Sequence, residues 1–190
     1  MDPREEVVRA AFPSLASLTD ESVRDAVVRV WLRMWAESLW SMPSDCPYNL
    51  VAPGVDLVTH VNQVVAGALQ LAGVASRLLG VAVDEDVLVA AGTLHDASKL
   101  VEYEPGDDGV PQQTELGRRL VHAEYAAAAA AEEGLPPQVV AIVVNHTTAS
   151  PEVPSTVEAL CVYYADMCAA DLARLGAGAA LHAAGHKMQP

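Results

Sequence analysis

The sequence predicts an all-α fold, a bundle with a core of about five helices and an N-terminal helical extension. Hydrophobic residues make up 52% of the 190 residues but aromatic residues only 5%, so Ala, Val and Leu side chains must fill the core. Small aliphatic side chains suit the close packing of helices. Apolar residues recur at helical spacing over several long segments, and clusters of proline and glycine separate these segments. Together these features favour a helical bundle over a sheet.

The first 45 residues are predicted to form a helical extension that packs on the main domain, residues 46–190. Residues 20–40 place apolar side chains at helical spacing between Arg24, Arg29 and Arg33, as expected of an amphipathic helix. Residues 41–54 follow with three prolines, an asparagine and a glycine, and are predicted to be an irregular connector. The length of the chain agrees with one compact domain that carries this extension.

The main domain is predicted to contain long helices over residues 56–79, 84–104, 116–133 and 155–175, with a weak helix in the tail. Asp84 is the expected N-cap of its helix, and Ser155 forms a capping box with Glu158. Residues 106–115 are polar and are predicted to form an exposed loop. Residues 138–147 are rich in valine, which also suits a strand, but their position between two helices favours a short buried helix that ends at His146.

The composition restricts the partners and the location of the protein. The chain has 25 acidic and 11 basic residues, a net charge of −14, which repels phosphate backbones and anionic lipid. A nucleic-acid polymer and a membrane are therefore unfavourable partners. The charged N-terminus, the interrupted apolar stretches and the absence of a CxxC pair among three cysteines predict a cytoplasmic protein. Trp31, Trp35 and Trp40 are interpreted as packing residues, with a homodimer contact as the alternative.

Four histidines fall on four successive predicted helical segments, one on each, and an aspartate directly follows the second. These residues are His60, His95, His122 and His146, with Asp96 beside His95 and Asp166 inside the last long helix. Imidazole nitrogens and carboxylate oxygens bind divalent metal ions, and helical bundles build metal sites from inward-facing side chains. Each histidine alone is more often an ordinary core residue, but the ordered set predicts a metal site.

Lys99 accompanies this set. If residues 84–104 form one helix, then His95, Asp96 and Lys99 project within about 100° of one face. Metal ligands and a positive charge would then lie side by side. The alternative is an ordinary pair between Lys99 and Glu102 or Tyr103 on the same helix.

In their order these residues resemble the signature of the HD superfamily, which is a histidine, a His-Asp doublet, further histidines and a final aspartate on five core helices. The pattern covers about residues 58–174, and every position is filled. The resemblance implies a first metal ion bound by His60, His95, Asp96 and Asp166. It also implies that Asp96 bridges to a second ion held by His122 and His146. Fe or Mn is the expected metal, with Mg, Ni, Co or Zn as alternatives, and one or two ions are expected.

The segment LHDASK is similar to the HDxxK form of this superfamily, in which the lysine lies by the substrate; Lys99 takes that position, and Ser98 replaces the usual small residue or glycine. The commonest activity of the superfamily is metal-dependent phosphoester hydrolysis, which makes Asp96 and Lys99 the catalytic candidates. Arg118 and Arg119 are candidates for substrate contacts, although such arginines more often mark an exposed face.

The resemblance also extends to particular branches of the superfamily. The stretch from His95 to Asp166 is similar to bacterial HD exoribonuclease domains, but the acidic surface favours a nucleotide or another small, anionic phosphorylated metabolite over RNA. The main alternative is a mixed-valent diiron oxygenase that cleaves a C–C or C–P bond, because one HD branch uses the same six ligands. A silent regulatory domain is disfavoured by the complete ligand set. Asp166 could also simply hydrogen-bond Tyr163 or Tyr164, and His146 could cap a helix.

Overall fold

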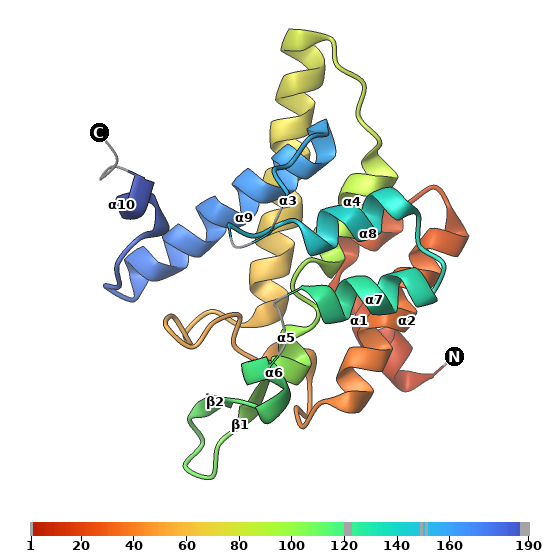
Figure 1. Cartoon of the computed structure of the whole chain (residues 1–190). Coiled ribbons are helices and arrows are strands. Elements are labelled where there is room, and N and C mark those ends of the chain that lie inside the picture. Colours follow the sequence, from red (N-terminus) through yellow and green to blue (C-terminus); the bar gives the residue numbers. More distant parts are fainter. Residues whose placement is uncertain (1, 120–122, 149, 151, 187–190) are drawn as a thin grey trace.

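The computed structural model describes residues 2–119, 123–148, 150 and 152–186, and it is helical apart from a short hairpin (Figure 1). The α-helices are α1 Pro3–Ala11, α2 Glu21–Glu37, α3 Leu57–Leu79, α4 Glu85–Leu94, α5 Lys99–Glu102, α6 Glu115–Arg119, α7 Glu124–Glu132, α8 Pro137–Val144, α9 Val157–Gly176 and α10 His182–His186. Two 3₁₀ turns, Pro13–Ser17 and Pro43–Asp45, flank α2, and the strands are β1 Tyr103–Pro105 and β2 Pro111–Gln113. The predicted all-α fold class is therefore confirmed.

Side-chain caps fix where the long helices begin. The Asp56 carboxylate accepts a hydrogen bond from the Thr59 N–H at the start of α3, and Asp84 accepts one from Val87 at the start of α4, as predicted. The predicted capping box at Ser155 is wrong. Thr156 caps α9 instead. The Glu158 carboxylate accepts a hydrogen bond from the Asp84 N–H at 2.8 Å, because α4 begins beside α9.

Helices α3, α4 and α9 form the centre of the core, and α9 crosses α3 in Figure 1. Small residues permit the close approach. A Cβ atom on Gly67 would lie 3.3 Å from the Ala165 Cβ, and one on Gly92 would lie 3.1 Å from a Val65 methyl group. Because the core contains few aromatic side chains and many small ones, these helices can pack with their backbones close together.

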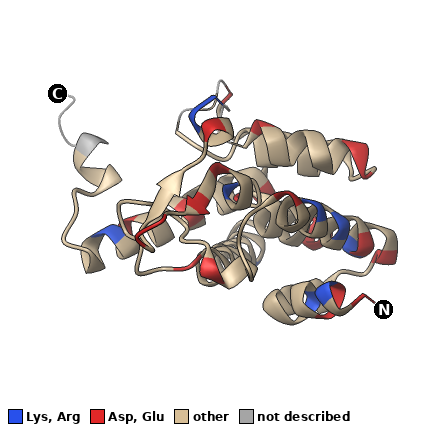
Figure 2. Cartoon of the chain, turned by 90° about the horizontal axis from the view of Figure 1, so that it is seen from below, with Lys and Arg blue, Asp and Glu red and all other residues tan. Residues whose placement is uncertain are grey.

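The N-terminal helices cover this core and share its buried cluster. Helix α2 packs on α4, α5 and α7, and the buried Trp31 donates its indole N–H to the Thr93 carbonyl at 3.1 Å. Trp35 and Trp40 are also buried, which agrees with the interpretation of the three tryptophans as packing residues. Figure 2 shows acidic residues spread over the chain and basic residues at fewer positions. The boundary near residue 45 stays a prediction.

The predicted helix over residues 84–104 is interrupted. Helix α4 ends at Leu94, residues 95–98 form a turn, and α5 begins at Lys99. Backbone bonds from Ala97 to Leu94 and from Lys99 to Asp96 span three residues rather than four, which tightens the chain there. The structure therefore corrects the idea that the doublet and Lys99 lie on one continuous helix.

Two other segments also differ from their predictions. The predicted loop at 106–115 contains β2, which pairs antiparallel with β1 so that Tyr103 faces Gln113. The predicted helix over 116–133 is two helices, α6 and α7, and Ala123 before α7 has a left-handed φ of 76°. In contrast, the short buried helix predicted near residues 138–147 is confirmed as α8, although it ends two residues before His146.

Gly117 brings α6 against α5. A Cβ atom at this position would lie only 2.3 Å from the Glu102 carbonyl oxygen. We expect Gly117→Ala to lower the free energy of unfolding by about 1–3 kcal/mol, because the methyl group would force two backbones apart. Urea denaturation measures this loss. Gly176→Ala is the matched control, since its Cβ would meet nothing within 4 Å, and equal stability of the two variants would contradict the tight contact.

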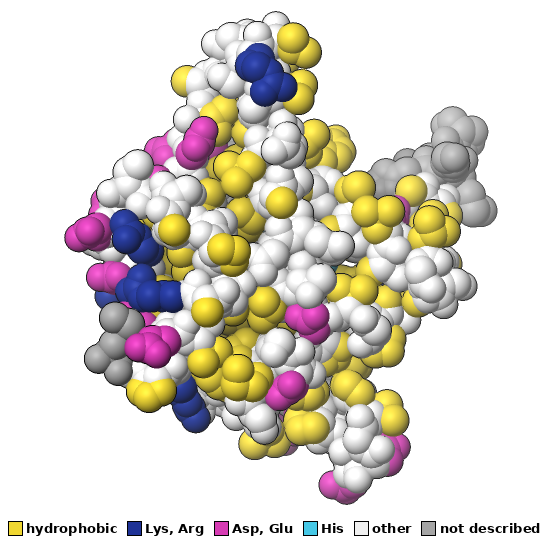
Figure 3. Space-filling view, turned by 180° about the vertical axis from the view of Figure 1, so that it is seen from behind, with side chains coloured by type: hydrophobic (Ala, Val, Ile, Leu, Met, Phe, Trp, Pro, Cys, Tyr) yellow, Lys and Arg dark blue, Asp and Glu magenta, His cyan; other side chains and the backbone are white. Residues whose placement is uncertain are grey.

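Helix α3 is long and apolar enough, by length and composition alone, to cross a membrane, which the prediction from interrupted apolar stretches did not anticipate. Core helices of soluble proteins share this property, and α3 carries the buried His60 and packs on α4 and α9. Its C-terminal end projects beyond the other helices (Figure 1), and hydrophobic side chains are visible on this end in the view from behind (Figure 3). Leu78 and Leu79 are exposed there.

Candidate metal centre

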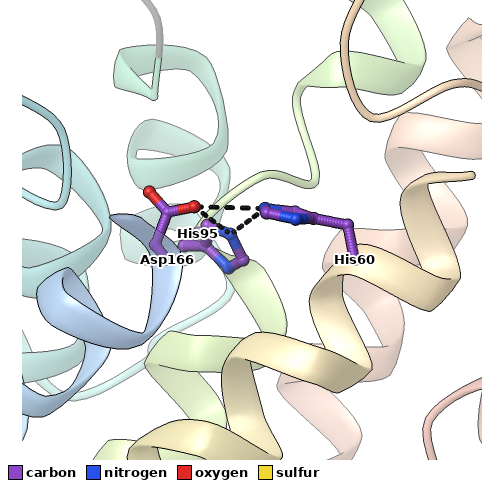
Figure 4. A group of neighbouring side chains, drawn as sticks. All are labelled: His60, His95 and Asp166. Carbon is purple, nitrogen blue, oxygen red and sulfur yellow. Dashed lines mark hydrogen bonds and ion pairs between the residues drawn. The ribbon is translucent and has the colours of Figure 1, made fainter. Parts of the chain in front are cut away.

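Three side chains from α3, the end of α4, and α9 point toward one another at a buried position (Figure 4). The His60 Nε2 atom lies 3.1 Å from Asp166 Oδ1 and 3.4 Å from His95 Nε2, and the His95 nitrogen lies 3.9 Å from the same carboxylate oxygen. The Asp56 cap places His60 in the first turn of α3. Residues far apart in the chain therefore meet at one point.

Asp96, in the turn after α4, extends the cluster in two directions. Its Oδ2 atom lies 3.3 Å from His60 Nε2 and 3.5 Å from His95 Nε2. Its Oδ1 atom lies 3.6 Å from His146 Nε2 and 3.6 Å from Lys99 Nζ. One carboxylate thus faces two different groups of side chains, because the turn at residues 95–98 directs it between them.

The donor spacing fits a divalent ion. Metal–ligand distances of about 2.0–2.2 Å place neighbouring donors roughly 3.0–3.5 Å apart in octahedral or tetrahedral coordination. The separations of 3.1–3.9 Å among His60, His95 and Asp166 require little adjustment. All three side chains are buried, and burying two imidazoles with carboxylates is costly unless a cation compensates. The geometry and the donor chemistry therefore both suit a metal ion.

Backbone carbonyls orient two of the imidazole rings. The Nδ1–H of His95 donates to the Gly92 carbonyl at 2.7 Å, and the Nδ1–H of His146 donates to the Val143 carbonyl at 2.6 Å. Each bond fixes the tautomer and turns Nε2 toward the cluster, as outer-shell bonds do in metal sites. The two rings meet edge to face with centroids 5.0 Å apart.

Burial and charge set the protonation of the cluster. Burial lowers the pKa of His95 to about 4, so this ring is neutral at neutral pH, as a metal ligand must be. Burial also acts against a charged His60, but hydrogen bonds to Asp166 and Asp96 outweigh it and raise the pKa of His60. For Asp166, burial favours the neutral acid, yet the bond from His60 outweighs it and lowers the pKa. Below its raised pKa, metal-free His60 therefore holds a proton between the two carboxylates.

This arrangement predicts that metal binding releases a proton. Below the raised pKa of His60 the ion must displace the proton on that ring, so apparent Mn²⁺ affinity should fall about tenfold per pH unit as the pH decreases. Above that pKa the affinity should no longer depend on this group. Titration calorimetry in two buffers of different ionisation enthalpy measures the released proton. Binding at pH 6 without proton release would contradict the assignment of His60.

Lys99 is buried beside the cluster, and its ammonium group forms an ion pair with Asp96. Burial would lower the pKa of Lys99, but the charge of Asp96 outweighs it and raises the pKa, so the side chain stays protonated. The Lys99 Nζ atom also lies 5.8 Å from the ring centroid of Tyr103. In the described residues no ion pair joins Lys99 to Glu102, whose carboxylate accepts the Ser98 hydroxyl at 2.6 Å.

The remaining predicted site residues have different positions. Arg118 and Arg119 are exposed on α6, where they contact the Gln113 carbonyl and the Glu115 carboxylate, and the structure does not bring them into the cluster. His122 lies outside the described residues. Asp166 bonds His60 rather than the neighbouring tyrosines, which contact each other.

Tyr48 is a site residue that the sequence did not indicate. It lies in the connector before α3, where no periodicity or motif distinguishes it, and its ring stacks on His60.

Comparison with known proteins identifies the segment that carries this cluster. A sequence profile of the HD domain matches residues 57–171. The dihydroneopterin 2',3'-cyclic phosphate phosphodiesterase of Methanocaldococcus jannaschii is 33% identical over 111 residues, which are 58% of this chain and 44% of that protein. The chain thus spans less than half the length of this relative. No solved structure gives a significant match.

Proposed function

This chain belongs to the HD domain family, since the matched segment covers more than half of it, and we propose that it is a metal-dependent phosphohydrolase acting on a small phosphorylated molecule. The observation that carries the proposal is the buried convergence of His60, His95 and Asp166, with one oxygen of Asp96 beside both imidazoles and Lys99 on its other oxygen. Such a set combines ligands for an ion with a fixed positive charge.

The roles of the residues follow from their positions. A divalent ion held there would polarise a phosphoryl oxygen and lower the pKa of water. His60, His95, Asp166 and the Oδ2 atom of Asp96 would hold it, while the Oδ1 atom of Asp96 fixes Lys99. The Lys99 ammonium would bind a phosphoryl oxygen and neutralise the charge that grows there, an effect that burial strengthens because little water screens it.

A second ion is part of the proposal. The Asp96 Oδ1 atom faces His146 at 3.6 Å, on the side away from His60, which supports a bridging carboxylate. His122 would complete that position. Two ions per chain in the loaded protein, and one ion after His146→Ala, would support a dinuclear site. Fe and Mn remain the preferred metals, since mixed imidazole and carboxylate ligands suit both.

A small cyclic phosphate diester is the substrate class that we prefer. The relative from Methanocaldococcus jannaschii is named for hydrolysis of a 2',3'-cyclic phosphate, which favours hydrolysis over the oxygenase alternative. The net charge of −14 also disfavours binding of a long polyanion.

The test uses one protein preparation loaded with Mn²⁺ and another loaded with Fe²⁺. Each is assayed with and without oxygen against 2',3'-cyclic nucleotides, bis(p-nitrophenyl) phosphate and small phosphonates. We expect phosphate ester hydrolysis that needs metal but not oxygen. Turnover that consumes oxygen, and occurs only with iron, would establish the oxygenase instead. Protein that binds no metal would refute both enzymatic interpretations.

A further inference from the structure

The three imidazoles of the metal centre are not held in the same way. A metal-binding histidine usually donates its second ring N–H to a carbonyl or carboxylate, which fixes the ring. His95 and His146 follow this rule with backbone carbonyls. The Nδ1 atom of His60 is buried and has no hydrogen-bond partner among the described residues. The support that Nδ1 gives the other two rings must therefore come from another contact in the case of His60.

The ring of Tyr48 makes that contact. Its centroid lies 4.3 Å from the centroid of the His60 imidazole, with 24° between the planes, so the two rings stack. Tyr48 is only 3% exposed, so this stack is shielded from solvent. A stacked ring restricts rotation of the imidazole but needs no hydrogen bond from Nδ1.

Hydrogen bonds fix the backbone and the hydroxyl group of Tyr48 relative to the helices that carry the site. The Tyr48 N–H donates to the Val55 carbonyl at 3.0 Å, and the Leu57 N–H donates to the Cys46 carbonyl at 2.8 Å, which closes the connector against the start of α3. The Tyr48 hydroxyl donates to the Ala170 carbonyl on α9 at 3.4 Å, one turn after Asp166. The ring thus has a fixed position relative to both helices.

The same ring also faces the cation of the site. The Lys99 Nζ atom lies 5.9 Å from the Tyr48 ring centroid, within the range of a cation–π interaction. Tyr48 therefore contacts a candidate metal ligand and the proposed phosphate-binding group, although it is itself too buried to be a substrate contact.

We propose that Tyr48 is a positioning residue of the metal centre. Its ring holds His60 with Nε2 directed at Asp166 and holds Lys99 beside Asp96. The residue lies before the segment matched by the HD domain profile, residues 57–171, so this support comes from the connector of this chain. The inference rests on the metal centre of the proposed function, but not on the reaction that the centre catalyses.

Calorimetric titration of the metal-free full chain with Mn²⁺ tests the proposal. Tyr48→Leu and Tyr48→Met remove the ring, and Tyr48→Phe keeps it. We expect both removal variants to bind Mn²⁺ about 10- to 100-fold more weakly than the wild type, the usual effect of losing an outer-shell support. Tyr48→Phe should stay within about threefold, because the stack with His60 is retained.

Phe12→Leu is the matched control. Phe12 is also fully buried and packs against an aromatic ring, with its centroid 4.4 Å from that of Trp31, and among the described residues no ring contact joins it to the cluster. This variant should lose stability and keep its Mn²⁺ affinity, which separates positioning from general loss of packing.

Several outcomes would overturn the proposal. These are wild-type Mn²⁺ affinity in a folded removal variant, equal weakening in Phe12→Leu, or weakened binding in Tyr48→Phe. If both removal variants fail to fold while Tyr48→Phe is normal, Tyr48 is a structural core residue and the positioning role is wrong. A wild-type protein that binds Mn²⁺ but hydrolyses no phosphate ester refutes the proposed function and leaves this test intact.

Discussion

Replacing Asp96 by alanine is expected to abolish metal retention and, with it, turnover. Its Oδ2 atom lies 3.3 Å from His60 Nε2 and its Oδ1 atom 3.6 Å from His146 Nε2, so one substitution removes donors from both halves of the cluster. The remaining histidines and Asp166 carry too little negative charge to hold a buried ion. We expect bound metal below about one tenth of the wild-type content and turnover reduced more than about 10³-fold. Elemental analysis and steady-state kinetics measure the two effects.

Two controls separate loss of metal from loss of folding. Asp96→Asn keeps the shape of the side chain but removes its charge, and it should also bind metal poorly. Asp84→Ala removes the exposed cap of α4 and should cost about 1 kcal/mol of stability while leaving the metal content unchanged. Full metal and turnover in Asp96→Ala would refute the assignment of the site.

The second large effect is expected for Lys99→Ala, which should keep its metal and lose turnover by about 10²- to 10³-fold. The ammonium group is buried, protonated and 3.6 Å from Asp96, so its removal takes away the fixed positive charge beside the site but none of the donor atoms. The loss should appear in kcat, because charge on the phosphoryl oxygens is greatest in the transition state.

Lys99→Arg and Arg77→Ala complete this series. An arginine keeps the charge but has a larger planar head that the enclosed space between Tyr48 and Tyr103 cannot take without rearrangement, so it should restore turnover only in part. Arg77 is exposed near the end of α3, and its removal should have no effect. Unchanged kinetics of Lys99→Ala on the identified substrate would remove the proposed role of this residue.

The fold could be predicted where local signals are strong. The helical spacing of apolar residues, the Asp84 cap and the position of α8 were read correctly, because each depends on residues near one another in sequence. The break after Leu94 was missed. Apolar residues continue on both sides of the His-Asp doublet, from Val87 to Leu94 and again at Leu100 and Val101, so their pattern does not reveal that the chain tightens there.

The site was predictable in part. The order of histidines and aspartates identified the candidate ligands, of which the structure brings His60, His95, Asp96, His146 and Asp166 together. The sequence gives no sign of Tyr48, because the connector that contains it lacks any pattern. Arg118 and Arg119 are predicted as substrate contacts, but in the structure they contact residues of their own segment at the surface. The assignment of the ligands stays a prediction until metal binding is measured.

By itself the sequence determined that this chain is helical and that its imidazoles and carboxylates recur in the order of the HD family, because spacing and residue type are local properties. Only the tertiary structure decided which atoms meet. The two oxygens of Asp96 face different partners because a turn replaces the helix there, and the ring of His60 is supported by a stacked tyrosine where His95 and His146 have a hydrogen bond at Nδ1. Such contacts depend on how helices that are distant in sequence cross each other. Many residues contribute to the free energy of this packing, and no local sequence pattern identifies them as neighbours.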